Sequence, residues 1–117
     1  MKIEVGSATG DAALVTCAGR LTGEAAEELL ARATAALGGE APRLLLDLAG
    51  VEYVTSSAIG SIVRLCKEVK DRGGVMVICA PQERVRLFFE IAGADALVRV
   101  VRTREEALAA LGCGEGA

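Results

Sequence analysis

The sequence has no histidine and no tryptophan, and it has one tyrosine among its 117 residues. Without histidine, the chain cannot carry a Ser-His-Asp or Cys-His catalytic set, a histidine-bearing zinc site or a histidine phosphorelay. Without tryptophan and with a single tyrosine, it has no aromatic platform on which bases or sugars could stack. These absences point away from an enzyme, and we expect the chain to bind no cofactor.

The chain also lacks a basic face and a long apolar run. Its formal net charge is −3 and its basic residues are scattered among acidic ones, whereas phosphate binding needs concentrated positive charge. The apolar runs fall short of the roughly 20 residues that a membrane span needs. Met1 is soon followed by the polar residues Lys2 and Glu4, not by the apolar core of a signal peptide. We therefore expect a cytoplasmic protein that neither binds nucleic acid nor inserts into a membrane.

Four cysteines are present, but they lie far apart and form no C-x-x-C pair. Because the sequence shows no export signal, we expect a compartment in which thiols stay reduced. Cys17, Cys66 and Cys79 are expected to be core residues, and Cys113 is expected to lie in a loose tail.

Hydrophobic residues make up 52% of the sequence, enough to build a core without metals or disulfides. They alternate in some segments and recur at helical spacing in others, which distinguishes strands from helices. The expected elements are strands at 3–5 and 12–17, a helix from the Thr22 cap to Leu37, a strand at 44–48 leading on to 54, a helix from 55–57 to Gly73, a strand at 75–80, a helix from Pro81 to Gly93, a strand at 97–101 and a helix at 103–111.

The predicted order is β-β-α-β-α-β-α-β-α. An opening hairpin followed by alternating strands and helices implies parallel crossovers, and hence an α/β domain with a mixed, mostly parallel sheet and about four helices. The run at 44–48 is apolar on both faces, which is typical of a central strand of a covered sheet. We expect one domain over residues 1–111 and a flexible tail over residues 112–117.

Three consecutive hydroxyl residues, Thr55, Ser56 and Ser57, stand where an apolar segment leads into a helix. One interpretation is structural, because a Ser or Thr at a helix start usually caps free backbone N–H groups. The other is functional: a phosphate on a serine here would carry about two negative charges at the positive end of a helix dipole. The domain could then stay folded while its surface changed in charge and bulk.

Other positions offer weaker signals. Asp47 ends a buried strand, where α/β sheets often bind ligands, but no second carboxylate accompanies it and we expect a solvated strand end. The double glycines at 38–39 and 73–74 match neither G-x-G-x-x-G nor a P-loop, so nucleotide binding has little support. The pair Phe88-Phe89 is expected to lie half in the core and half toward a partner, with the core favoured. The charged residues expected on the solvent side of the third helix are Arg84, Arg86 and Glu90.

Several segments, in order along the chain, match the pattern of one family. They are Leu44–Leu48, Val51–Val54, Thr55–Gly60, Lys70–Gly74, Pro81, Val85–Arg86, Phe88–Phe89 and Ala92–Gly93. This ordered set resembles the STAS domain of anti-sigma factor antagonists, and the similarity runs from about Ile3 to Leu111. The segment Gly19–Thr22 also resembles the family's loop between its second strand and first helix.

The resemblance implies a phosphorylation switch. In the family the motif usually reads Asp-Ser-Ser/Thr-Gly-Leu, and an anti-sigma factor kinase phosphorylates the first serine. This chain has Thr55 for the aspartate, Ser56 for the phosphoacceptor, Ser57 for the next hydroxyl, Ala58 for the glycine and Ile59 for the leucine. Ser56 is therefore the implied phosphorylation site, with Ser57 as second choice. By this resemblance the unmodified protein binds the anti-sigma factor and releases a sigma factor, and phosphorylation ends the binding.

The predicted partner surface joins this helix start to the Thr22 loop, where many family members carry another aspartate. Loops that leave the carboxyl ends of parallel strands gather at one edge of a sheet, so the two should be neighbours. Ala58, Gly60 and Ser61 are expected on the exposed face of the first turn, where their small size would let a partner approach closely. The predicted contact residues are Thr22, Thr55, Ser56, Ser57, Ala58, Ile59, Gly60 and Ser61.

An alternative function stays open. The STAS family also contains members that are never phosphorylated, including accessory subunits of lipid-transport ABC systems and subunits of signalling assemblies. In that case the partner would be a transporter or signalling-complex subunit, and the helix start would be a permanent interface. A hydrolase with Ser56 as its nucleophile is disfavoured because no histidine is present to activate the hydroxyl.

Overall fold

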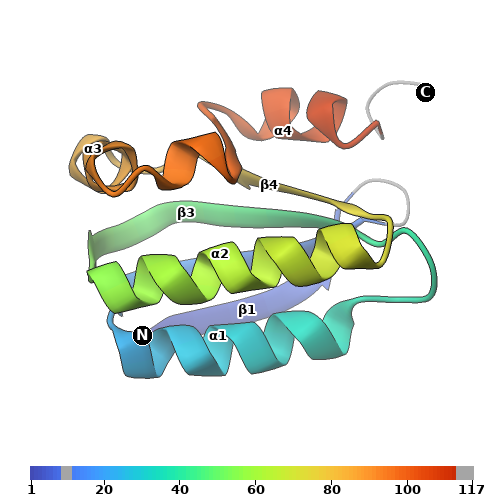
Figure 1. Cartoon of the computed structure of the whole chain (residues 1–117), viewed down its shortest axis with the longest axis horizontal. Coiled ribbons are helices and arrows are strands. Elements are labelled where there is room, and N and C mark those ends of the chain that lie inside the picture. The colour runs from blue at the N-terminus through green and yellow to red at the C-terminus, as the bar shows by residue number, and fades with distance from the viewer. Residues whose placement is uncertain (9–11, 113–117) are drawn as a thin grey trace.

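The computed structural model describes residues 1–8 and 12–112, and its elements follow the predicted order (Figure 1). A short 3₁₀ turn, η1, is the one addition within these ranges. The elements are β1 (Lys2–Ser7), β2 (Ala13–Leu21), α1 (Gly23–Ala36), β3 (Arg43–Val54), α2 (Ser56–Asp71), β4 (Val75–Cys79), α3 (Glu83–Ile91), η1 (Ala94–Ala96), β5 (Arg99–Val101) and α4 (Arg104–Ala110).

The sheet has five strands in the spatial order β1-β2-β3-β4-β5. β1 pairs antiparallel with β2, while β2 with β3, β3 with β4 and β4 with β5 are parallel pairs. Each parallel pair needs a crossover connection, and α1, α2 and α3 lie in these connections. The predicted mixed, mostly parallel sheet is confirmed.

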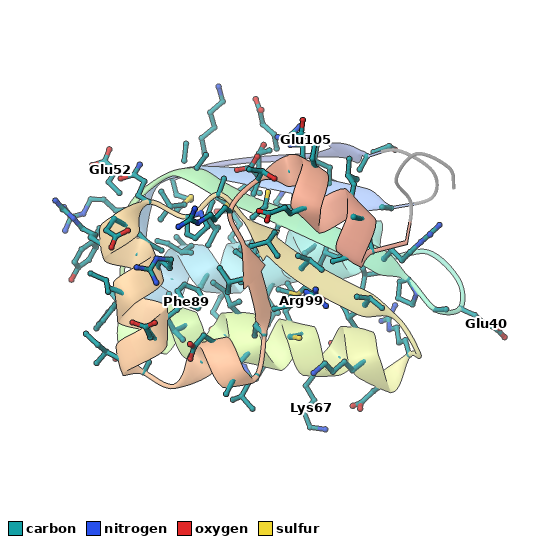
Figure 2. All side chains as sticks on the ribbon, turned by 90° about the horizontal axis from the view of Figure 1, so that it is seen from above. Glu40, Glu52, Lys67, Phe89, Arg99 and Glu105 are labelled. Atoms are coloured by element: carbon teal, nitrogen blue, oxygen red, sulfur yellow. The ribbon has the colours of Figure 1, made fainter. Side chains whose placement is uncertain are left out.

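The apolar run of β3 is buried on both faces of the sheet. Leu44 and Leu46 belong to the larger core cluster, which α1, α2 and α3 complete, whereas Leu45 belongs to a smaller cluster beneath α4. Figure 2 shows α2 and α4 on opposite sides of β4. Burying a leucine side chain stabilises the fold by about 1.5–3 kcal/mol, so this two-sided strand is a main source of stability, as its sequence pattern predicted.

Helices α1 and α2 run side by side and begin at the same end of the sheet (Figure 1). The predicted buried stripe of α2 is confirmed for Ile59, Ile62, Cys66 and Val69, and Val63 is half-buried. Because the two helices start together, their first turns lie at the same end of the molecule.

Three strands differ in extent from the prediction, and the first of them, β1, spans Lys2–Ser7 instead of residues 3–5. β2 runs on to Leu21 instead of ending at Cys17, because it continues to pair with β3, where Leu21 lies opposite Val54. Gly19, with φ of 109°, lies at a register shift of this pair and adopts a backbone conformation that other residues rarely do. β5 begins at Arg99, two residues later than expected, because the backbone N–H groups of Leu97 and Val98 donate to the Ala94 carbonyl oxygen of η1.

The prediction of a solvated Asp47 is wrong. Its side chain is 12% exposed, and its carboxylate accepts hydrogen bonds from the Arg104 guanidinium at 2.6 Å and the Ala49 backbone N–H at 2.9 Å. Arg104 is the first residue of α4, which starts with the predicted capping box of Thr103 and Glu106. The ion pair therefore fastens the start of α4 to the sheet.

The cysteines Cys17, Cys66 and Cys79 are buried and carry free thiols, as predicted. Burial, followed by the negative charge of Asp47, raises the pKa of Cys17 to about 12 and the pKa of Cys79 to about 11. These two thiols therefore stay protonated, and so unreactive as nucleophiles, at neutral pH.

The predicted flexible tail, residues 112–117 with Cys113, lies outside the described residues except for Gly112. A bilayer-spanning helix needs about 20 apolar residues. In the part of the chain that the structure describes, no helix is long and apolar enough to cross a membrane.

Candidate partner-binding site at the start of helix α2

Two strand-to-helix junctions lie next to each other at one edge of the sheet. The backbone N–H of Thr55, after β3, donates a hydrogen bond to the carbonyl oxygen of Leu21, at the end of β2, at 3.1 Å. Each junction caps a helix. Thr22 Oγ1 accepts from the Ala25 N–H at 3.3 Å, and Thr55 Oγ1 accepts from the Ala58 N–H at 3.1 Å. The expected proximity of the two junctions and the capping role of their hydroxyls are confirmed.

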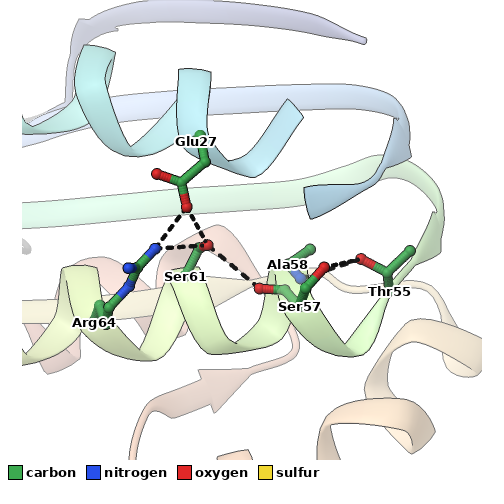
Figure 3. Close-up of polar contacts among 6 residues, drawn as sticks. All are labelled: Glu27, Thr55, Ser57, Ala58, Ser61 and Arg64. Atoms are coloured by element: carbon green, nitrogen blue, oxygen red, sulfur yellow. Dashed lines mark hydrogen bonds and ion pairs between the residues drawn. The ribbon is translucent and has the colours of Figure 1, made fainter. Parts of the chain in front are cut away.

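The two serines of the junction have different surroundings. Ser57 Oγ lies 3.2 Å from Thr55 Oγ1 (Figure 3). It also faces α1 so closely that a Cβ atom at Gly23 would lie 2.5 Å from it. Ser56 is exposed, and no described residue forms a hydrogen bond with its hydroxyl. Of the two serines, Ser56 therefore has the more accessible oxygen.

Ser61 joins α2 to α1 (Figure 3). Its hydroxyl donates to the Glu27 carboxylate at 2.9 Å, and Arg64 Nη2 donates to the same carboxylate oxygen at 2.6 Å and to Ser61 Oγ at 3.0 Å. The hydrogen bonds from Ser61 and then Arg64 lower the pKa of Glu27. Ser61 is buried, with only 5% of its surface exposed. The expectation that it lies on the exposed face of the first turn is therefore wrong.

Some of the other predicted contact residues are buried and some are exposed. Ala58 and Ile59 are buried in the core, so the expected exposure of Ala58 is wrong as well. Helical periodicity turns these positions toward the sheet. Gly60 is exposed, and a Cβ atom there would meet nothing within 4 Å. The predicted residues that reach the surface are Thr22, Thr55, Ser56, Ser57 and Gly60, and their role in binding stays a prediction.

Two hollows flank the start of α2. The α1-side hollow, of about 480 Å³, is lined by Gly23, Glu27, Ser57, Gly60, Ser61 and Arg64. The α3-side hollow, of about 550 Å³, is mainly apolar and is lined by Tyr53, Val54, Thr55, Ser56, Arg84, Leu87, Phe88 and Ile91. Ser57 and Ser56 thus face different hollows, and a modification of either serine would alter a different half of this surface.

The sequence indicated α3 at this surface only through the partner-facing half of the Phe88-Phe89 pair, and it did not indicate Arg84, Leu87 or Ile91. Arg84 lines the α3-side hollow together with Leu87 and Ile91, which are exposed although they are large and apolar. Phe89 is buried, whereas Phe88 is half-buried and lines the α3-side hollow, so one member of the pair packs in the core and the other reaches the surface. The four-residue spacing of Leu87 and Ile91 was an available signal, because it marks a second apolar stripe beside the buried one.

A five-stranded mixed sheet that presents a capped, hydroxyl-bearing helix start between two hollows defines a module suited to binding another molecule. The model of the STAS domain family matches residues 6–107, and the chain belongs to this family. The resemblance inferred from the sequence motifs is thereby confirmed.

Relatives and solved structures agree with this assignment. Over 101 residues the chain is 31% identical to BtrV of Bordetella bronchiseptica, a provisionally named anti-sigma factor antagonist, covering 86% of this chain and 87% of BtrV. The fold matches an anti-sigma-factor antagonist (STAS) domain protein of Planctomyces limnophilus with a TM-score of 0.83 and 26% identity, over 94% of this chain and 97% of that one. SpoIIAA of Bacillus, solved in its phosphorylated form, has a TM-score of 0.69 at 19% identity, over 93% and 98% of the two chains. This last likeness concerns the fold alone.

Proposed function

We propose that the chain is an anti-sigma factor antagonist. It binds an anti-sigma factor that is also a serine kinase, so that a sigma factor is released, and phosphorylation of Ser56 ends the binding. The observation that carries the proposal is the exposed Ser56 hydroxyl, which no described residue engages, at the start of α2. Membership of the STAS family and the naming of BtrV support the functional class.

The modification is a phosphoryl transfer from ATP bound by the partner. The Ser56 oxygen attacks the γ-phosphorus of ATP, the bond from that phosphorus to the β,γ-bridging oxygen breaks, and ADP leaves. The serine proton passes to a base of the kinase. This chain supplies the nucleophilic oxygen and its position, and the kinase supplies the rest.

A phosphate on Ser56 is compatible with the folded domain. α2 has 16 residues and no acidic residue in its first turn, so a charge of about −2 would meet the positive end of the helix without a like charge in that turn. The caps Thr22 and Thr55 are uncharged as well. Phosphorylation would therefore change the surface and leave the fold in place.

The same phosphate would weaken an interface at this position. A partner packed against the unmodified start of α2 would have to exclude water from about two added charges, and the cost of burying unpaired charge is large. Acidic groups of the partner would in addition be repelled. Binding would thus depend on the state of Ser56.

Incubation with the cognate anti-sigma factor kinase and ATP tests the proposal. Intact-mass measurement should show one added phosphate, and peptide mapping should place it on Ser56. Ser56→Ala should abolish the modification, and the matched variant Ser57→Ala should keep it. Phosphate on Ser57 alone would move the switch to the α1-side hollow. Tight binding without any phosphorylation would instead favour an unswitched subunit of a transporter or signalling assembly.

A further inference from the structure

The α3-side hollow is apolar, yet it has positive charge at its rim. Its wall includes Tyr53 from β3 and Leu87 and Ile91 from α3, which are 42%, 39% and 79% exposed. Arg84, in the first turn of α3, is the one charged residue among the described residues that line it. A second guanidinium, that of Arg20, lies 4.6 Å from the centroid of the Tyr53 ring.

Among the described residues, none forms an ion pair or a hydrogen bond with the Arg84 guanidinium. Arg86, two residues later on the same helix, is held by Glu83 at 2.9 Å and by Glu90 at 3.6 Å. The chain as a whole is acidic, with a net charge of −3. A positive, apolar hollow on an acidic protein is complementary to a segment that carries both apolar side chains and carboxylates.

We propose that Arg84 is a cation shared in turn by two anions. In the unmodified protein it pairs with a carboxylate of an acidic, amphipathic segment of the partner, whose apolar side chains fill the α3-side hollow. After modification, the phosphate on Ser56 pairs with Arg84 and withdraws it from the partner. The pairing of Arg84 with a phosphate on Ser56 rests on the proposed function. The docking of an acidic partner segment in the α3-side hollow, which we call the docking half, does not.

Both pairings have a physical basis. A guanidinium matches the planar geometry of carboxylates and the oxygens of phosphates, and it forms two parallel hydrogen bonds with either. A phosphate with about two negative charges competes well against a carboxylate with one. Ser56 and Arg84 line the same hollow, and the long arginine stem is flexible enough to bring its charged end to either anion.

The intramolecular pairing can be tested without a kinase. Phosphoserine placed at position 56 during translation gives a uniform sample, and ³¹P NMR titration gives the second pKa of its phosphate. Because Arg84 favours the dianion, this pKa should be about 0.2–0.7 unit higher in Arg84→Gln than in the protein with Arg84. The control Arg86→Gln should leave the pKa unchanged, since Arg86 is engaged by Glu83 and Glu90. Equal pKa values with and without Arg84 would overturn the shared-cation model.

The docking half is tested with phage-displayed random peptides panned on the unmodified protein. Enriched peptides should combine leucine or phenylalanine with aspartate or glutamate, and synthetic copies should bind roughly tenfold more weakly to Arg84→Glu. Arg86→Glu, the matched control, should bind them as the unsubstituted protein does. Absence of enrichment, or enrichment of basic or uncharged peptides, would overturn the docking model.

Tyr53 locates the bound peptide. It is the single tyrosine of the chain, so 3-fluorotyrosine labels only the wall of this hollow, and its ¹⁹F resonance should shift when peptide binds. A resonance that does not move would place the peptide elsewhere and contradict the model. A shift that depends on protein concentration alone would show a second copy of the chain in the hollow, which also contradicts it.

The proposed function and the shared-cation model can be contradicted independently of each other. If the kinase does not modify Ser56, the proposed function is contradicted while the three measurements above remain valid, because none of them uses the kinase. If the phosphate pKa is insensitive to Arg84, the shared-cation model is contradicted even when the kinase modifies Ser56 efficiently.

Discussion

The hydroxyl of Ser61 in α2 donates a hydrogen bond to the carboxylate of Glu27 in α1, at 2.9 Å and across 34 positions of sequence. This contact links the two helices near the end where both begin. The Ser61 hydroxyl, which the sequence motif predicted to contact a partner, is therefore engaged within the fold. The surface that a partner can reach at the start of α2 is smaller by this residue.

Replacing Ser61 by alanine should raise the pKa of Glu27 toward 4.5, because the hydrogen bond from Ser61 is the first cause of its lowering. An NMR titration of the Glu27 carboxyl carbon measures this. A folded-state pKa below the unfolded one stabilises the fold above the unfolded pKa, and the contribution is lost as pH falls through the lowered value. The stability difference between the natural chain and Ser61→Ala should thus narrow below pH 4.5. An unchanged Glu27 pKa would show that the contact is not formed in solution.

Bulky substitutions at Gly60 and Ser61 should separate binding from folding. Gly60→Trp should fold normally, because a Cβ atom there meets nothing within 4 Å, and it should weaken binding to the anti-sigma factor. Ser61→Trp should lose about 1–3 kcal/mol of unfolding free energy or more, because a large side chain would be forced between α1 and α2. Urea unfolding and calorimetric binding measure the two effects. Full affinity in Gly60→Trp would shift the interface toward α3.

Ser56→Asp should fold normally and gain about 0.3–1 kcal/mol of stability, because a carboxylate at this position interacts favourably with the helix dipole. It should nevertheless bind the anti-sigma factor more weakly, as the phosphorylated protein would. The control Ser57→Asp adds the same charge on the side of the α1-side hollow and should weaken binding less. Thermal melting of Ser56→Asp well below the natural chain would mean that residue 56 points into the core, which contradicts the exposed switch.

Removing the partner of Asp47 should destabilise the domain. Arg104→Met leaves a carboxylate oxygen of Asp47 without its ion pair in a side chain that is 12% exposed, a loss of about 1–3 kcal/mol. The double variant Asp47→Leu with Arg104→Met should cost less than the sum of the single changes, because it removes the unpaired charge as well. Additive effects in this double-mutant cycle, measured by urea unfolding, would show that the two residues do not interact.

Much of the fold was predictable because it depends on residues close together in sequence. Thr22 and Thr55 cap helices through N–H groups three positions away, and Thr103 forms its capping box with Glu106. The central strand at 44–48 could be predicted for a similar reason, because burial on both faces of a sheet requires apolar residues at successive positions. Caps, helix periodicity and two-sided burial are local rules, so the order of elements and the exposed position of Ser56 followed from them.

Contacts between distant elements were not predictable in this way. Helical periodicity shows which residues share a face of α2, but it does not show that α1 covers Ser61. Asp47 meets Arg104 across 57 positions, and Arg84 joins Ser56 at one hollow only because α3 packs beside the end of β3. Such contacts arise when whole elements dock to bury their apolar faces. Short-range patterns carry no information about which neighbour a face will meet. Only the folded chain therefore shows that Ser61 is buried against α1 and that Ser56 lies beside Arg84.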